Sequence, residues 1–256
     1  MPAGARVPHA RPVPAFALFT FRMTSPADHL PTLRSGRWFA ALPSGLAQAL
    51  MDMAESRSLG AGEALFLRGN APCGLYAVVR GAIDISGVGG QSDKARASLL
   101  TRLEAPAWFG EIALFDGSVR THDAHAATAA TLVHVPQEPL LAHLARHPPH
   151  WHALALLLTD KLRTALIALE EMALLPAPQR VARRLALMAE GYGQWTDASR
   201  SRRVIALSQE ELSLMLALSR QTINQILKEL QARGLLQVHR GEIEVCDLPA
   251  LRAAGG

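Results

Sequence analysis

Residues 208–236 read SQEELSLMLALSRQTINQILKELQARGLL and predict two helices joined by a short turn. Ser208 and Glu211 have the S-x-x-E spacing of a capping box, which starts the first helix, and Ser219 can cap the second helix. Ala217 occupies a turn position where glycine is common, so we expect slight backbone strain there. The segment is therefore interpreted as a helix-turn-helix.

The second of these helices has two chemically different faces. Its apolar face consists of Ile223, Ile226, Leu227 and Leu230. Its polar face carries Arg220, Gln221, Gln225 and Lys228, and the helix contains no acidic residue before Glu229. Because Arg and Gln side chains pair with base edges and Lys contacts phosphate, this face predicts a helix that lies in a DNA groove. A polar face that is merely solvated is the alternative.

Composition limits the classes of protein to consider. The chain has 256 residues, of which 49% are hydrophobic and 19% charged, which predicts folded domains with real cores. A net charge of +4 permits an anionic partner. The two cysteines, Cys73 and Cys246, are too few for a disulfide framework. No apolar run approaches the length of a membrane span, so we expect a cytoplasmic protein without a membrane partner.

The N-terminal segment is rich in proline. The apolar stretch AFALFTF (15–21) is not followed by a small-residue cleavage site, so it does not predict a signal peptide. We expect residues 1–30 to be a poorly ordered extension. Translation could start at Met1 or at Met23, and the sequence leaves both open.

Two segments upstream of the helix-turn-helix have residue patterns that predict different secondary structure. Residues 58–136 consist of short, alternating or β-branched segments bounded by Gly, Asn and Pro, which predicts a compact all-β unit. Residues 150–175 contain no Pro or Gly and predict one long helix, which begins after Pro149 and ends before Pro176.

The long helix carries two apolar faces. One face repeats with 4-3-4-3 spacing and predicts a seam that pairs with a second copy of the chain. This seam consists of Trp151, Ala155, Leu158, Leu162, Ala165, Leu169 and Met172. The other face, Leu154, Leu157 and Leu166, is expected to pack on the β unit. Burial of the first face within its own chain is the alternative to a homodimer.

Residues 208–236 resemble the winged helix-turn-helix of the CRP/FNR-type bacterial transcription regulators, with HRGEIEV (239–245) as the wing. Independently, the β unit resembles the cyclic-nucleotide-binding domain of the same family. That resemblance rests on LGAGEALFLRGN (59–70), GLYAVVRGAIDIS (74–86) and WFGEIALFDGSVRT (108–121). Together the two resemblances cover about residues 35–250, in the family's domain order.

The resemblance implies an α+β fold with three functional parts. An N-terminal β-roll, a jelly roll of the cyclic-nucleotide-binding type, is expected over residues 31–147 as the sensor domain. A dimerisation helix is expected over 148–176. A winged helix-turn-helix that binds DNA is expected over 177–256.

Residues 109–126 match the family's phosphate-binding cassette, which implies a set of ligand contacts. Gly110 would let the backbone approach a ligand closely, and the backbone N–H groups of Ile112 and Ala113 would face its phosphate. Arg120 and Thr121 would bind that phosphate through a guanidinium and a hydroxyl group. Glu111 would accept a hydrogen bond from a ribose hydroxyl.

Two observations modify this picture of the cassette. Members of the family that bind cAMP carry a Thr-Ser pair on the dimer helix that contacts adenine. Ala165 and Leu166 stand at those positions here, with Thr164 one residue away. Without the resemblance, Glu111 and Arg120 are equally compatible with an ordinary ion pair at a strand edge.

The resemblance also assigns DNA contacts. Arg220 matches the family's guanine-reading residue, and Ser219 and Thr222 match its phosphate contacts. The expected DNA-contacting set is Ser208, Gln209, Ser219, Arg220, Gln221, Thr222, Gln225 and Lys228. Gln221 and Gln225 differ from the best-known member, so we expect a different operator sequence.

These expectations define the function. The protein is predicted to bind near-palindromic double-stranded DNA operators as a homodimer, with RNA polymerase as a further partner if it activates transcription. The resemblance implies no fixed cofactor, and cAMP or another cyclic nucleotide is the candidate effector. Two alternatives stay open. One is the same regulator with a different small-molecule effector or none. The other is a nucleotide-binding protein-interaction module without DNA binding.

Catalytic and metal-binding patterns are not found. The sequence contains no G-x-S-x-G, H-E-x-x-H or P-loop motif, so we predict no enzyme and no catalytic residues. His122, Asp123 and His125 are close in sequence, but on a strand the two histidines would point to opposite faces. We therefore predict no metal site, and none of the histidines stands out as a haem ligand.

Overall fold

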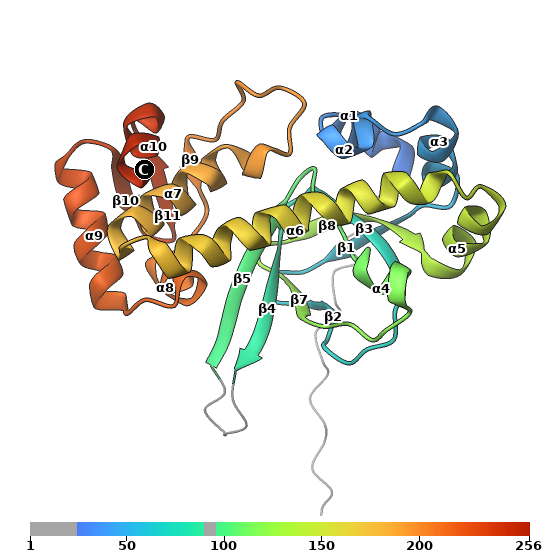
Figure 1. The fold of residues 1–256 in the computed structure, drawn as a ribbon, viewed down its shortest axis with the longest axis horizontal. Coiled ribbons are helices and arrows are strands. Elements are labelled where there is room, and N and C mark those ends of the chain that lie inside the picture. Colours follow the sequence, from blue (N-terminus) through green and yellow to red (C-terminus); the bar gives the residue numbers. More distant parts are fainter. Residues whose placement is uncertain (1–24, 90–95) are drawn as a thin grey trace, which may run out of the picture.

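The computed structural model describes residues 25–89 and 96–256, which form two parts joined by one long helix (Figure 1). The proposed N-terminal extension falls almost wholly outside the described residues. Within them, Ser25 caps a short helix with a capping box, so regular structure begins before residue 30. The tip of the hairpin predicted at 87–95 also lies mainly outside the described residues.

The N-terminal part combines short helices with eight strands. Its first helices are η1 (Pro26–His29), α1 (Leu30–Arg34), α2 (Arg37–Ala40) and α3 (Ser44–Asp52). Its strands are β1 (Glu55–Leu59), β2 (Ala64–Phe66), β3 (Gly74–Arg80), β4 (Ala82–Gly89), β5 (Arg96–Glu104), β6 (Trp108–Phe109), β7 (Asp123–Ala126) and β8 (Ala130–Pro136). Helix α4 (Ile112–Asp116) lies between β6 and β7 in the chain, and α5 (Gln137–Arg146) follows β8.

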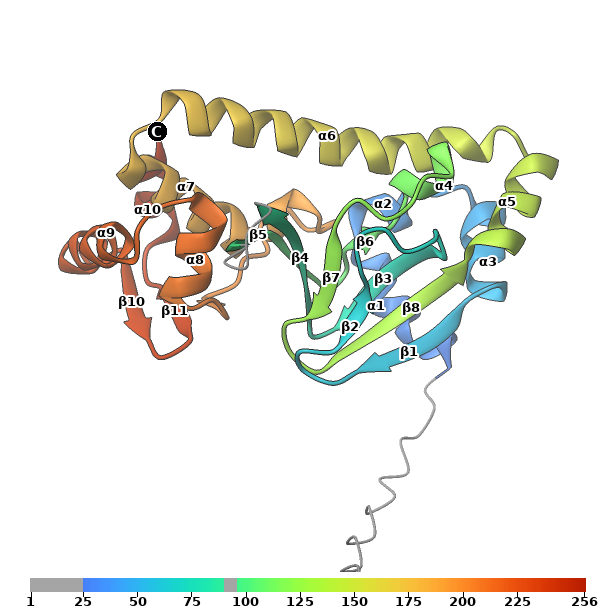
Figure 2. The ribbon, with the colours of Figure 1, turned by 90° about the horizontal axis from the view of Figure 1, so that it is seen from below.

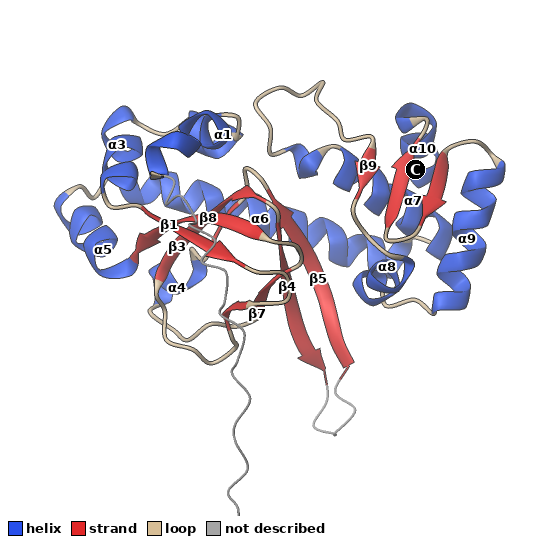
Figure 3. Cartoon of the chain, turned by 180° about the vertical axis from the view of Figure 1, so that it is seen from behind, coloured by secondary structure: helices blue, strands red, loops and turns tan. Residues whose placement is uncertain are grey.

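The strands form two antiparallel sheets, with the orders β1-β8-β3-β6 and β2-β7-β4-β5. Alternate side chains of both sheets face one another, because successive residues of a strand point to opposite sides. Tyr76, Val78, Ile83, Phe109 and Leu132 fill the space between the sheets. The predicted all-β unit is therefore confirmed as a two-sheet β-roll (Figure 3).

Helix α6 (His150–Leu174) follows the predicted bounds closely and runs along both parts of the molecule (Figure 2). Leu154 and Leu157 are buried in the core that also holds residues of β3 and β8, as expected. The expectation for Leu166 was wrong, because this side chain is 57% exposed. It lies more than two turns beyond Leu157, where α6 has left the core of the β-roll.

The C-terminal part is a small helical domain with a three-stranded sheet. It contains α7 (Ala177–Ala189), η2 (Gly191–Gly193), β9 (Val204–Ile205), α8 (Gln209–Leu216), α9 (Arg220–Ala232), β10 (Leu236–His239), β11 (Glu242–Val245) and α10 (Leu248–Gly255). Its sheet has the order β10-β11-β9, and the predicted wing is the hairpin β10–β11. Helices α5 and α10 were not anticipated from the sequence.

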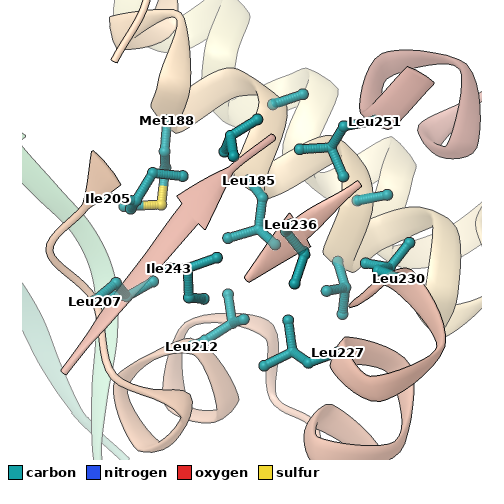
Figure 4. Packing of buried hydrophobic residues seen from close by; sticks show 14 of the residues in the cluster. Leu185, Met188, Ile205, Leu207, Leu212, Leu227, Leu230, Leu236, Ile243 and Leu251 are labelled. Carbon is teal, nitrogen blue, oxygen red and sulfur yellow. The ribbon is translucent and has the colours of Figure 1, made fainter. Parts of the chain in front are cut away.

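The core of this domain explains the apolar faces of α8 and α9. Leu185 of α7, Leu212 of α8, Leu227 of α9 and Ile243 of β11 pack together (Figure 4). Ala217, which ends α8, has a φ of 52°. The strain expected at this turn position is therefore present, since L side chains rarely adopt positive φ.

Within the described part of the chain, no helix combines the length and apolarity that crossing a membrane would require.

Candidate DNA interface and ligand site

Helix α9 presents its polar face outward. Arg220, Gln221, Gln225 and Lys228 are all exposed. On the opposite side, Ile223, Ile226, Leu227 and Leu230 are at most 4% exposed. The buried face fixes the rotation of the helix, so the four polar side chains point away from the protein.

Glu210, on the preceding helix α8, lies beside the polar face of α9. Arg220 forms an ion pair with Glu210 of α8, and both side chains remain largely exposed. An exposed pair of this kind contributes little to stability, typically below about 1 kcal/mol, and exchanges readily. Within α9 itself, Gln225 donates to Glu229 at 3.2 Å. Arg220 is thus held in place but remains available to another partner.

The ends of the two helices are capped as predicted. Ser208 Oγ accepts from the backbone N–H of Glu211 at 3.2 Å, and a Glu211 carboxylate oxygen accepts from the N–H of Ser208 at 2.7 Å. Ser219 Oγ accepts from the N–H of Thr222 at 3.0 Å. Gln209 joins the helices, because its side-chain oxygen accepts from Asn224 at 3.0 Å. Ser208, Gln209 and Thr222 are half-buried, and Ser219 is exposed.

In the β-roll, the Arg120 guanidinium is buried and bound to the protein itself. It donates to the carbonyl oxygens of Gly74 at 2.8 Å and Gly110 at 3.1 Å, and to Cys73 Sγ at 3.2 Å. The ring of Phe66 lies 4.4 Å from the guanidinium carbon. Arg120 Nε is buried without a partner among the described residues. The arrangement keeps a cation close to the start of α4, as a phosphate site requires.

Gly110 and Glu111 occupy the turn that leads into α4. Gly110 has a φ of 99°, and a Cβ added there would lie 2.8 Å from the carbonyl oxygen of Gly74. Only glycine fits this position without strain. Ile112 and Ala113 are the first two residues of α4, and the N–H groups of a first helical turn have no partner within the helix.

Glu111 is paired with a residue that the sequence analysis did not single out. Glu111 is 1% exposed, and its carboxylate accepts from Lys161 Nζ of α6 at 2.5 Å. Burial lowers the pKa of Lys161, and the adjacent Glu111 opposes that lowering. The alternative of a strand-edge ion pair between Glu111 and Arg120 is therefore wrong. The only sequence signal for Lys161 was its place one turn before Thr164.

The two predicted threonine contacts are bonded locally. Thr121 is exposed, and its hydroxyl lies 2.9 Å from His122 Nδ1. Thr164 is exposed, and its hydroxyl donates to the carbonyl oxygen of Asp160 in α6 at 2.9 Å. The structure therefore brings Gly110, Glu111 and Arg120 together, whereas Thr121 and Thr164 are bonded to their own neighbours.

The predicted seam of α6 is exposed over its C-terminal half. Leu162, Leu169 and Met172 are 56%, 61% and 55% exposed. At its N-terminal end Trp151 packs on Phe115 of α4, with 5.2 Å between ring centres. Together with His152 and Ala155 these two residues line an open apolar hollow. The apolar face of α6 is thus continuous with the surface of α4.

The pKa values of two histidines, the buried His134 and the clustered His143, are lowered. His134 is 4% exposed, and its Nε2 lies 2.9 Å from the carbonyl oxygen of Cys73, so this nitrogen carries the proton. Burial lowers the pKa of His134. Burial, followed by His147 and His150, lowers the pKa of His143, whose Nε2 lies 2.9 Å from His150 Nδ1.

Two family models match the chain. Residues 56–147 match the cyclic nucleotide-binding domain, and residues 179–254 match the Crp-like helix-turn-helix domain. The matched regions coincide with the β-roll and with the C-terminal domain, in that order.

Three known proteins illustrate the similarity. The chain is 27% identical to the CRP-like cAMP-activated global transcriptional regulator of Mycobacterium tuberculosis, over 84% of this chain and 93% of that protein. It is 29% identical to the Cyclic AMP receptor protein of Thermus thermophilus, over 78% and 90%. The crystal structure of TTHA1359, a CRP/FNR-family regulator from Thermus thermophilus, matches with a TM-score of 0.60 and 25% identity, over 78% and 98%.

The fold and both matched domains agree with the resemblance seen in the sequence. The relatives are transcription regulators and not enzymes. The chain therefore belongs to the CRP/FNR type of DNA-binding transcription regulators, with a cyclic nucleotide-binding domain and a Crp-like helix-turn-helix.

Proposed function

We propose that the protein binds near-palindromic operators as a homodimer, with α9 of each protomer in the major groove. The observation that carries this proposal is the outward polar face of α9 above a fully packed apolar face. Two recognition helices about 34 Å apart would read successive half-sites. Arg220, Gln221 and Gln225 would contact bases, and Lys228 would contact phosphate.

The remaining contacts are assigned to the ends of the helices. Ser208 and Gln209 at the start of α8, and Ser219 and Thr222 at the start of α9, would position the DNA backbone. Helix N-termini suit this role, because their free N–H groups attract phosphate. The exposed apolar seam of α6 supports pairing with a second copy, since burying it removes several leucine side chains from water.

A cyclic nucleotide is the proposed effector, and cAMP is the first candidate. Arg120, Gly110, Glu111 and the start of α4 form a polar group that fits a phosphate next to a sugar hydroxyl. The names of the M. tuberculosis and T. thermophilus relatives specify cAMP. A nucleotide would have to compete with the carbonyl groups that bind Arg120 and with Lys161, which binds Glu111. The free energy of nucleotide binding therefore includes the cost of breaking these bonds of Arg120 and Glu111.

We assign the sensor domain to residues 31–147, the dimerisation helix to 148–176 and the DNA-binding domain to 177–256. RNA polymerase is the proposed further partner if the protein activates transcription. A DNA partner would place the protein in the cytoplasm. The effector would act by differential affinity for two arrangements of the dimer.

Selection from a random DNA pool tests the DNA proposal, with cAMP and other cyclic mono- and dinucleotides as additives. We expect a two-fold symmetric site. Arg220→Ala should weaken binding by roughly 1–3 kcal/mol and relax the preference at one position per half-site. Failure to enrich any site under every condition would contradict the proposal.

Calorimetric titration tests the effector. Arg120→Ala should abolish nucleotide binding, whereas Arg163→Ala, an exposed change on α6, should preserve it. If wild-type protein binds no nucleotide at millimolar concentration, the cyclic nucleotide is excluded and the regulator has another effector or none.

A further inference from the structure

The sensor domain and the DNA-binding domain of one protomer are joined by a buried arginine. Arg102 of β5 is 6% exposed and donates to both carboxylate oxygens of Asp84 on β4, at 2.7 and 2.8 Å. The same guanidinium donates to Glu211 of α8 at 2.5 Å and to the carbonyl oxygen of Ala206. The Arg102 side chain of the β-roll thus binds the segment at the start of the helix-turn-helix.

Apolar packing and further polar bonds surround this contact. Leu99, also on β5, is 6% exposed and belongs to the core of the DNA-binding domain. Arg202 of that domain pairs with Glu104 of β5 and lies over the ring of Trp195. Figures 1 and 3 show β5 beside α8. The Arg102 guanidinium is therefore largely shielded from water, although the Asp84 and Glu211 side chains that bind it are partly exposed.

Backbone hydrogen bonds extend the contact to the N-terminal helices. The N–H of Arg37 donates to the carbonyl oxygen of Gln194 at 2.7 Å, and the N–H of Thr196 donates to that of Ser35 at 2.9 Å. These bonds are made by main-chain atoms, so they do not depend on the side chain at position 102.

The Arg102 contact lies next to the residues of α8 that are proposed to contact DNA. Ala206 and Glu211 flank Ser208 and Gln209, the residues proposed to meet the DNA backbone at the start of α8. Glu211 also completes the cap of α8. The neighbouring Glu210 pairs with Arg220 of α9. The Arg102 contact therefore fixes the segment that leads into α8, next to the residues proposed to meet the DNA backbone, relative to the sensor domain.

We propose that Arg102 is an autoinhibitory latch that holds the helix-turn-helix against its own sensor domain until DNA or effector binding releases it. This inference rests on the proposed function, because DNA affinity is its readout. Two carboxylates hold one buried guanidinium, so the latched arrangement is specific. Release would expose Arg102 to water, and water would offset part of the lost pairing.

The experiment measures DNA binding without nucleotide, by fluorescence anisotropy on the selected operator. Arg102→Met should tighten binding by roughly tenfold, within the usual range of coupling between two sites. Arg102→Lys, which keeps the charge but loses the forked geometry, should tighten it less. Arg252→Met removes the same charge from an ion pair with Glu190 inside the DNA-binding domain, and is the matched control.

The direction of the change in DNA affinity distinguishes release of the latch from the simple loss of a positive charge. Loss of a cation by itself weakens binding to DNA. Tighter binding by Arg102→Met, together with faster hydrogen exchange at β5 and the start of α8, would support the latch. Equal or weaker binding by both Arg102 variants, with circular dichroism showing them folded, would overturn it. Failure of every protein to bind any selected site would instead overturn the DNA proposal, and the inhibitory role with it.

Discussion

The pair formed by Glu111 and Lys161 offers a quantitative test of the ligand site. Replacing Lys161 with Met removes the cation and keeps most of the side-chain volume. Glu111, which is 1% exposed, would then be a buried carboxylate without its counter-ion. Replacing Glu111 with Gln in the same protein removes that uncompensated charge. The two single variants and the double variant form a complete cycle.

The structure sets the expected magnitudes. Removing one partner of a fully buried pair costs about 3–5 kcal/mol. The Lys161 side chain is 31% exposed, so water can reach part of the site. We therefore expect Lys161→Met to lower the free energy of unfolding by roughly 2–3 kcal/mol. The double variant should recover at least about 1 kcal/mol of this loss, since coupled neighbours interact by about 0.5–3 kcal/mol.

Urea unfolding followed by tryptophan fluorescence measures these free energies. The proteins must be compared at one concentration, because dimer formation adds to apparent stability. Arg163→Met is the matched control on α6, and its exposed position predicts a change within about 0.5 kcal/mol. A loss below about 0.5 kcal/mol for Lys161→Met, with no recovery in the double variant, would refute the claim that Glu111 depends on Lys161.

Three further predictions concern the dimer, the DNA contact and pH. Leu162→Glu with Leu169→Glu should shift the protein from dimer to monomer in sedimentation equilibrium, because both exposed side chains lie in the proposed seam; an unchanged mass would contradict the seam. Lys228→Ala should weaken binding to all DNA sequences alike and reduce the slope of log K against log salt by about 1; a sequence-selective loss would make Lys228 a base reader instead. The free energy of unfolding should fall as pH drops from about 6.5 toward the lower pKa values of folded His134 and His143, because the unfolded chain takes up protons first. His134→Asn should make this pH dependence shallower in urea titrations at pH 7.5 and 5.5, and an identical slope would rule out His134 as a contributor.

Local signals in the sequence predicted the elements well. The capping box at Ser208 and Glu211, the αL strain at Ala217 and the length of α6 all appear in the structure as expected. Each of these features depends on residues within a few positions of one another. Leu166 shows the limit, because helical spacing gives the side of a helix but not how far its partner extends.

Contacts between segments that are far apart in the sequence could be identified only from the tertiary structure. Lys161 lies 50 residues from Glu111, and Arg102 lies 109 residues from Glu211. No periodicity or motif links such positions, because ion pairs are chosen by how sheets, helices and domains dock. By itself, the sequence determined the long helix α6, the β unit, the helix-turn-helix and the polar face of α9, since backbone propensity and the alternation of apolar residues act over short stretches. Only the folded chain decided which charges meet, because desolvation and distance depend on the whole packing.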